Sequence, residues 1–181
     1  MIKSFSHLRV ASEYSISHGL ITIDQIVDQA VKNNMPSVAL TDNLNMFGLV
    51  KFFIKAEKKG IKPISGSSIN VIFEGDDFAH ELLCLAKNNN GHKNLMKILS
   101  QSHNNIHFPS PIITFEELCL LKNDIKVISG GKSSHIFDLL KRGKVEDTKT
   151  KLETFQSAFG EDFVIEVQKT NRADELDYIS H

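Results

Sequence analysis

Short apolar runs alternate along most of the chain with stretches in which apolar residues recur every three or four positions. The first pattern is typical of strands and the second of amphipathic helices. The predicted strands cover residues 5–10, 37–40, 62–73, 82–86, 125–128 and 163–167. The predicted helices cover residues 22–35, 47–59, 114–121, 133–142 and 145–159, with another around Leu95, Ile98 and Leu99 and a helix start at 172–179.

Capping boxes mark the start of two of these helices. Thr22 with Gln25, and Thr114 with Glu117, place a hydroxyl and an amide or carboxyl group three residues apart, so each can satisfy a free backbone N–H of the first turn. The first helix also carries an apolar stripe that we expect to be buried, formed by Ile23, Ile26, Val27, Ala30 and Val31.

Repeated strand-then-helix units predict an α/β protein with a parallel sheet or barrel. In such folds the functional residues lie at the carboxyl ends of the strands. The strand at 62–73 is expected to be interrupted at Gly66-Ser67-Ser68, and the turn at 74–77 suggests a hairpin with the strand at 82–86. Further polar breaks are predicted at 88–91 and 101–111.

The composition is that of a globular domain without a membrane segment. The 181 residues are 41% apolar and 24% charged, and no run of about eighteen apolar residues occurs. We therefore expect a cytoplasmic protein with no membrane contact. The formal net charge of -1 argues against a basic DNA-binding surface on this chain. Cys84 and Cys119 stand in apolar stretches without zinc-site spacing, so they are expected to be buried free thiols.

Polar and ionisable residues gather where the predicted strands end. The groups are His7-Leu8-Arg9, Thr41-Asp42-Asn43, Gly66-Ser67-Ser68, His80-Glu81 and Ser129-Gly130-Gly131. Imidazole and carboxylate groups at converging strand ends could bind Zn²⁺ or Mn²⁺, but each ion needs about three protein ligands and arginine is not a ligand. A hydrogen-bonded structural role for His7 and a turn or capping role for Asp42 stay open as alternatives.

The other histidines show no ligand spacing. Neighbouring residues on a strand face opposite sides, so at most one of His80 and Glu81 faces such a site and the other is expected to be exposed to solvent. His92, His103, His107 and His135 are predicted to be solvated, in loops or on helix surfaces. Nucleotide-binding loops, the serine-hydrolase elbow and the zincin motif do not occur in the sequence.

Several longer motifs, taken in order, resemble a known family. They are HLRVASEYS at 7–15, MPSVALTD at 35–42, FGLVKF at 47–52, GIKPISG at 60–66, LAKNNNG at 85–91, ISGG at 128–131 and FVIEV at 163–167. This set resembles the PHP (polymerase and histidinol phosphatase) domain that forms the amino-terminal region of bacterial DNA polymerase III alpha subunits.

The resemblance implies an α/β fold of the PHP type, a distorted seven-stranded (β/α) barrel. Residues 1–181 would be the amino-terminal part of that domain, with the barrel incomplete because the chain stops before the remaining elements. The polymerase aspartates, which use Mg²⁺, and the parts that contact DNA would lie downstream, so no polymerase catalytic residue is expected here. The implied partners are the other subunits of the polymerase holoenzyme, especially the proofreading exonuclease.

Active members of the family hold a trinuclear metal cluster with an HxH motif, a TDH motif, a glutamate after the GxKP strand and further histidines. His7 and Asp42 match this pattern. The departures are Arg9 for the second histidine, His18 for an aspartate, Asn43 for the histidine after Asp42, Ser68 for the glutamate, and Glu81 in a histidine position. The resemblance therefore implies a vestigial site at His7, Asp42 and Glu81, which would hold Zn²⁺ or Mn²⁺ only if enough ligands remain.

Arg9 is expected to replace a metal ion structurally. We hypothesise that its guanidinium forms a buried, bidentate pair with Asp42 and that the chain itself binds no metal or cofactor. The function that follows is a noncatalytic scaffold that stabilises the polymerase and docks the exonuclease subunit. The alternative is a metal-dependent phosphoesterase or 3′–5′ exonuclease of the PHP type, which would need several more ligands.

Overall fold

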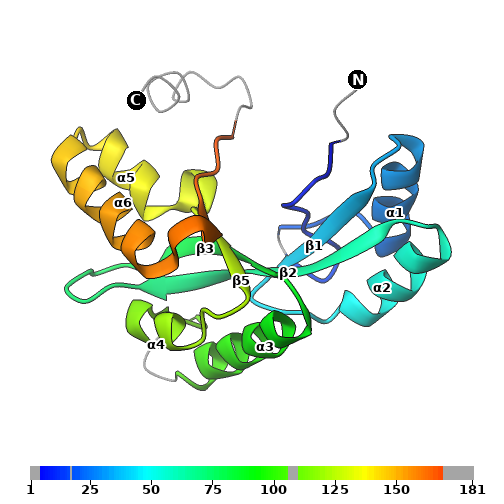
Figure 1. Ribbon diagram of the computed structural model, residues 1–181, viewed down its shortest axis with the longest axis horizontal. Helices are drawn as coiled ribbons and strands as arrows, with labels where there is room; N and C mark the ends of the chain where they lie inside the picture. The colour runs from blue at the N-terminus through cyan, green and yellow to red at the C-terminus, as the bar shows by residue number, and fades with distance from the viewer. Residues whose placement is uncertain (1–4, 17, 106–109, 169–181) are drawn as a thin grey trace.

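Residues 5–16, 18–105 and 110–168 are described by a computed structural model and form a mixed α/β fold around one sheet (Figure 1). The helices are α1 (Ile23–Lys32), α2 (Leu49–Lys58), α3 (Asn89–Asn104), α4 (Phe115–Leu120), α5 (His135–Lys141) and α6 (Val145–Phe159), with short 3-10 helices at Gly131–Ser133 and Gly160–Asp162. The strands are β1 (Ser37–Asn43), β2 (Lys62–Ile72), β3 (His80–Ala86), β4 (Ile113–Thr114), β5 (Ile125–Ile128) and β6 (Phe163–Val164).

The sheet has the strand order β1-β2-β3-β5-β6, and β4 pairs with β2 off this path. The β1–β2 and β5–β6 pairs are parallel, whereas β3 runs antiparallel to both of its neighbours. The prediction of a parallel sheet is therefore wrong at β3. The reason is that the turn after β2 leads directly into a hairpin, which needs no crossover helix. In that turn Asp76 donates its N–H to the Phe73 carbonyl at 3.1 Å, so the predicted hairpin is confirmed.

Strand β2 continues through the point where we expected an interruption. Gly66, Ser67 and Ser68 pair with β1 on one side and with β3 on the other. Backbone partners on both sides outweigh the low strand propensity of glycine and serine. Gly66 also lacks room for a side chain, since an added Cβ would lie 2.6 Å from a Leu85 methyl and 2.7 Å from a Thr41 methyl.

The first predicted strand is absent and the last is shorter than expected. Residues 5–10 bend at Leu8 and form no strand, although the His7 and Val10 carbonyls each accept a backbone hydrogen bond of 2.9 Å from β1. Two such bonds hold the segment beside β1 without forming a continuous ladder. Strand β6 ends at Val164, three residues before the predicted end. The helix start expected at 172–179, and His107, lie outside the described residues.

Local signals placed most helices correctly. Both capping boxes are present at α1 and α4, and α6 has the predicted bounds. The break expected at 88–91 is instead the start of α3, where the Asn88 side chain accepts from the N–H groups of Asn90 and Gly91, and α3 continues to Asn104. Val31 is 42% exposed, so its predicted burial is wrong. No helix in the described ranges is long and apolar enough to cross a membrane.

The core lies on both faces of the sheet. Leu82 and Cys84 of β3 belong to the larger cluster, which includes Ile98 of α3 and Phe155 of α6. Leu83 and Leu85 belong to a separate cluster that also contains Ala39 and Ile128. A third cluster joins α1, α2 and β1. Because side chains alternate along a strand, this division also fixes the face on which each polar residue of β3 lies.

Candidate functional site

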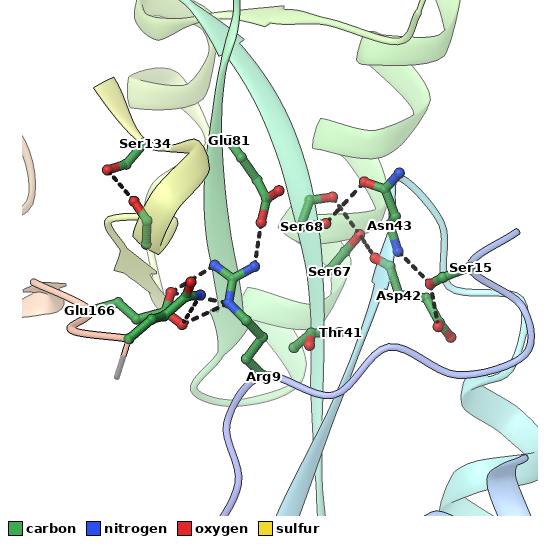
Figure 2. A network of polar contacts seen from close by, with 12 residues as sticks. Arg9, Ser15, Thr41, Asp42, Asn43, Ser67, Ser68, Glu81, Ser134 and Glu166 are labelled. Carbon is green, nitrogen blue, oxygen red and sulfur yellow. Dashed lines mark hydrogen bonds and ion pairs between the residues drawn. The ribbon is translucent and has the colours of Figure 1, made fainter. Parts of the chain in front are cut away.

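Arg9 lies at the centre of a group of charged residues from three separate parts of the chain (Figure 2). Its Nε donates to both oxygens of Glu166, at 2.8 and 3.0 Å, and its second terminal nitrogen donates to Glu166 Oε2 at 2.7 Å. The other terminal nitrogen forms a hydrogen-bonded ion pair with Glu81 Oε1. The guanidinium thus joins β3 to the segment after β6 through two carboxylates.

This cluster of Arg9, Glu81 and Glu166 is partly shielded from solvent. The three side chains are 29%, 23% and 17% exposed, in that order. Burial alone would lower the pKa of Arg9, but the hydrogen bonds and charges of Glu166 and Glu81 outweigh it and raise that pKa above its ordinary value. The arginine is therefore held as a permanent cation between two acidic groups.

Glu166 is held in place by its own neighbours. Its backbone N–H donates to the Ser129 hydroxyl at 2.9 Å, and Gln168 Nε2 donates to its Oε1 at the same distance. Ser129 follows β5 directly and is fully buried, so the chain after β6 is fixed against the end of β5. A positioned carboxylate gives a stronger pair with Arg9 than a mobile one would, because less side-chain entropy is lost.

Asp42 forms a second polar group, at the carboxyl end of β1. Its carboxylate accepts from the Ser12 N–H at 2.7 Å, from the Ser12 hydroxyl at 2.9 and 3.0 Å, and from the Ser15 hydroxyl at 2.6 Å. Asp42 is 1% exposed, and neutral donors satisfy its charge. Nearby, Ser67 donates to the Asp42 carbonyl at 2.8 Å and Ser68 donates to Asn43 Oδ1 at 3.1 Å.

The hypothesis that Arg9 pairs with Asp42 is wrong. The partners of Arg9 are Glu81 and Glu166, and the carboxylate of Asp42 accepts its hydrogen bonds from Ser12 and Ser15. The loop between Ser12 and Ser15 folds over Asp42 and supplies its donors locally. Arg9 is then free to reach two carboxylates, one on β3 and one in the segment after β6, which offer it more hydrogen bonds than a single aspartate.

The histidines of the predicted site do not gather around Asp42. His7 is exposed, and its ring makes an edge contact with Phe5 at 4.9 Å between centroids. His18 is also exposed, and its Nδ1 lies 3.3 Å from the Ile16 carbonyl. Of the residues proposed from the sequence, the structure brings Arg9 and Glu81 together and leaves His7, His18 and Asp42 with other neighbours.

Sequence reasoning missed Glu166 and misjudged His135. Glu166 stands 157 residues from Arg9, and the sequence signals for it were its place near the end of a predicted strand and within the FVIEV motif at 163–167. His135, predicted to be solvated, is 8% exposed, and the ring of His80 stacks on it with centroids 4.1 Å apart. His135 of α5 packs against the β2–β3 hairpin, of which His80 is part, and this tertiary contact is not revealed by the spacing of residues.

Comparison with known proteins agrees with the order of motifs. The PHP domain family matches residues 7–170. Proteins named DNA polymerase III subunit alpha are 36% identical in Vibrio cholerae over 178 residues, 35% in Borreliella burgdorferi over 174 residues and 32% in Pasteurella multocida over 178 residues. These alignments cover 97%, 91% and 97% of this chain, but it spans only 15% of each relative. On the family match, the chain belongs to the PHP domain family.

Proposed function

We propose that this chain is the amino-terminal part of the PHP domain of a bacterial DNA polymerase III alpha subunit and acts there as a noncatalytic structural domain. The identity of 32–36% to three proteins of that name, along nearly all of this chain, supports the assignment. Nucleotide addition with Mg²⁺ and the contacts with DNA would then belong to other parts of the parent protein. The near-neutral charge of the chain suits contacts with proteins better than contacts with DNA.

The arrangement of Arg9 is the observation that carries the noncatalytic role. Its guanidinium engages both oxygens of Glu166 and one of Glu81, which are carboxylates that could otherwise attract a metal ion. Arginine supplies positive charge and directed N–H donors but has no lone pair for a metal and no position for a bound water. The cluster of Arg9, Glu81 and Glu166 can therefore stabilise the fold, but it cannot generate a hydroxide nucleophile.

The other family positions, His7 and Asp42, do not supply the metal ligands that this cluster lacks. The Asp42 carboxylate is already satisfied by Ser12 and Ser15, and the exposed His7 ring contacts Phe5. A hydrolytic metal site keeps about three protein ligands around each ion and one open position. We infer that His7, Asp42 and Glu81 are a vestigial set that does not hold Zn²⁺ or Mn²⁺ for catalysis.

A hydrolysis assay tests this part of the proposal. The chain is incubated with Mn²⁺ or Zn²⁺ and a 3′-labelled oligonucleotide, with the Asp42→Asn variant as the matched control. We expect both proteins to give the same background rate of oligonucleotide hydrolysis. Metal-stimulated hydrolysis that is lost in both His7→Ala and Asp42→Asn would instead establish the alternative, a PHP-type phosphoesterase or exonuclease.

We further propose that the domain docks the proofreading exonuclease subunit of the same holoenzyme. A calorimetric titration of the parent alpha subunit with the exonuclease subunit measures the affinity, and removal of residues 1–181 from the parent should abolish it. Unchanged affinity after that removal would place the docking surface elsewhere. Retained polymerase activity in the truncated parent would show that the rest of the protein is still folded.

A further inference from the structure

The face of β3 opposite the cluster of Arg9, Glu81 and Glu166 carries a second group of ionisable side chains. Glu81 and His80 are neighbours on the strand, so their side chains lie on opposite faces of the sheet. His80 shares its face with Leu82 and Cys84, which pack in the larger core cluster. The helices α5 and α6 lie beside the β2–β3 hairpin on this side (Figure 1).

Three potential metal ligands meet there. Asp76 comes from the hairpin turn, His80 begins β3 and His135 begins α5. Asp76 Oδ2 lies 3.2 Å from His135 Nδ1 and 3.9 Å from His80 Nε2, and the three ligand atoms all lie within 4.8 Å of one another. The structure therefore brings two imidazoles and one carboxylate together from three separate elements.

Two of these atoms are buried without a hydrogen-bond partner. Asp76 Oδ2 and His135 Nδ1 face each other, and neither forms a hydrogen bond within the described residues. A buried polar atom without a hydrogen-bond partner destabilises the folded chain. A ligand shared by the two atoms would satisfy both of them at once.

We propose that Asp76, His80 and His135 bind one divalent transition-metal ion, with Zn²⁺ as the best match. Two histidines and a carboxylate are a ligand set that Zn²⁺ accepts. Two ligands at about 2.0–2.1 Å from a tetrahedral zinc ion lie roughly 3.3 Å apart, and the 3.2 Å between Asp76 Oδ2 and His135 Nδ1 fits this spacing. His80 Nε2, 3.9 Å from Asp76 Oδ2, is the third ligand atom of the set.

The surroundings hold the ligands in place. The Phe73 ring packs edge-on against His135, with centroids 5.3 Å apart, and His135 stacks on His80. The opposing feature is Lys151, whose ammonium lies 3.7 Å from the Phe73 ring centroid and repels a cation at this place. The repulsion predicts that Lys151→Met binds the metal more tightly than the unaltered chain.

This site is separate from the family positions discussed above. His7, Asp42 and Glu81 contribute none of its ligands, and Glu81 lies on the other face of β3. The proposal therefore does not rest on the noncatalytic role of the domain. An experiment that refutes one of the two proposals therefore does not refute the other.

Metal titration of the chelator-treated 181-residue chain tests the site. Zn²⁺ binding is measured by calorimetry, and Co²⁺ is used as a spectroscopic probe because tetrahedral Co²⁺ absorbs strongly in the visible range. We expect one equivalent of metal. His80→Gln and His135→Gln should each weaken binding at least about tenfold, since even loss of a residue that only orients a ligand costs 10–100-fold.

Matched variants separate this site from other histidines. His103→Gln, on α3, and His7→Gln should bind metal as the unaltered chain does. His80 is only partly buried, so His80→Gln is expected to keep its circular dichroism spectrum even if His135→Gln unfolds. Absence of one-equivalent binding, or binding that survives in His80→Gln and is lost in His7→Gln, would overturn the proposal.

Discussion

Arg9 should contribute substantially to stability, and Arg9→Met is the change that tests this. Methionine keeps much of the length and apolar contact of the arginine stem but removes every hydrogen bond to Glu81 and Glu166. Two partly buried carboxylates would then lie near each other with no cation between them. The variant loses attraction and gains repulsion at the same time.

The expected loss of stability in Arg9→Met follows from the number of carboxylates that lose Arg9 as a partner and from their exposure to solvent. Hydrogen bonds to charged groups contribute about 1.5–3 kcal/mol each. Because the three side chains keep 17–29% of their exposure, water partly replaces the lost donors, and we take the lower value once for each carboxylate. The expected loss is therefore about 3 kcal/mol, which corresponds to a fall in Tm of roughly 6–12 °C for a domain of this size.

Chemical denaturation followed by circular dichroism measures this loss, and Arg142→Met is the matched control. Arg142 forms an exposed i,i+4 pair with Asp138, at 3.0 Å, whose loss should cost no more than about 0.5 kcal/mol. A double-mutant cycle between Arg9→Met and Glu166→Gln should show a coupling energy above about 1 kcal/mol. Equal stability of the two methionine variants, or strict additivity in the cycle, would refute the structural role assigned to Arg9.

Three further changes test other parts of the structure. Asp42→Ala leaves three buried donors without an acceptor and should cost about 3 kcal/mol in the free energy of unfolding, whereas a cost below about 1 kcal/mol would contradict the hydrogen-bond network. Gly130 has a φ of 85°, and a Cβ added there would overlap the Glu81 carbonyl, whereas Gly143 has a φ of 70° and open space around it. Gly130→Ala should therefore lower the free energy of unfolding by at least about 1 kcal/mol more than Gly143→Ala does. Burial raises the pKa of Cys84 to about 12, so this thiol should resist alkylation at pH 8 until the chain unfolds, and labelling of the native chain as fast as of the unfolded chain would refute its burial.

Elements defined by neighbouring residues were predictable from the sequence. The α1 and α4 starts depend on a hydroxyl and a carboxyl or amide group three residues apart, and the chain alone contains both partners. Strand β2 was harder because Gly66, Ser67 and Ser68 have poor strand propensity by themselves. Their conformation is decided by β1 and β3, which pair with them from both sides.

In the candidate site, too, the sequence predicted some features and not others. Arg9, Asp42 and Glu81 stand out in the sequence because their types and positions can be compared with a family pattern. Their partners could not be deduced in this way. The choice between Asp42 and Glu166 as the partner of Arg9 depends on how the loop at Ser12 folds over β1 and where the chain runs after β6.

The position of Arg9 suits a structural role better than a chemical one. Arg9 lies on the segment beside β1, at one end of the sheet order, and Glu166 follows β6 at the other end, while Glu81 belongs to the central strand β3. A cation at this place links the two ends of the sheet order, β1 and β6, which do not pair directly with each other. Attraction between that cation and the carboxylates needs only charge and hydrogen-bond geometry, which a guanidinium provides. Hydrolysis also needs an exchangeable coordination position for water, which a guanidinium cannot provide. If Arg9 stands in place of a metal ligand, as we propose, the substitution keeps the first property and removes the second.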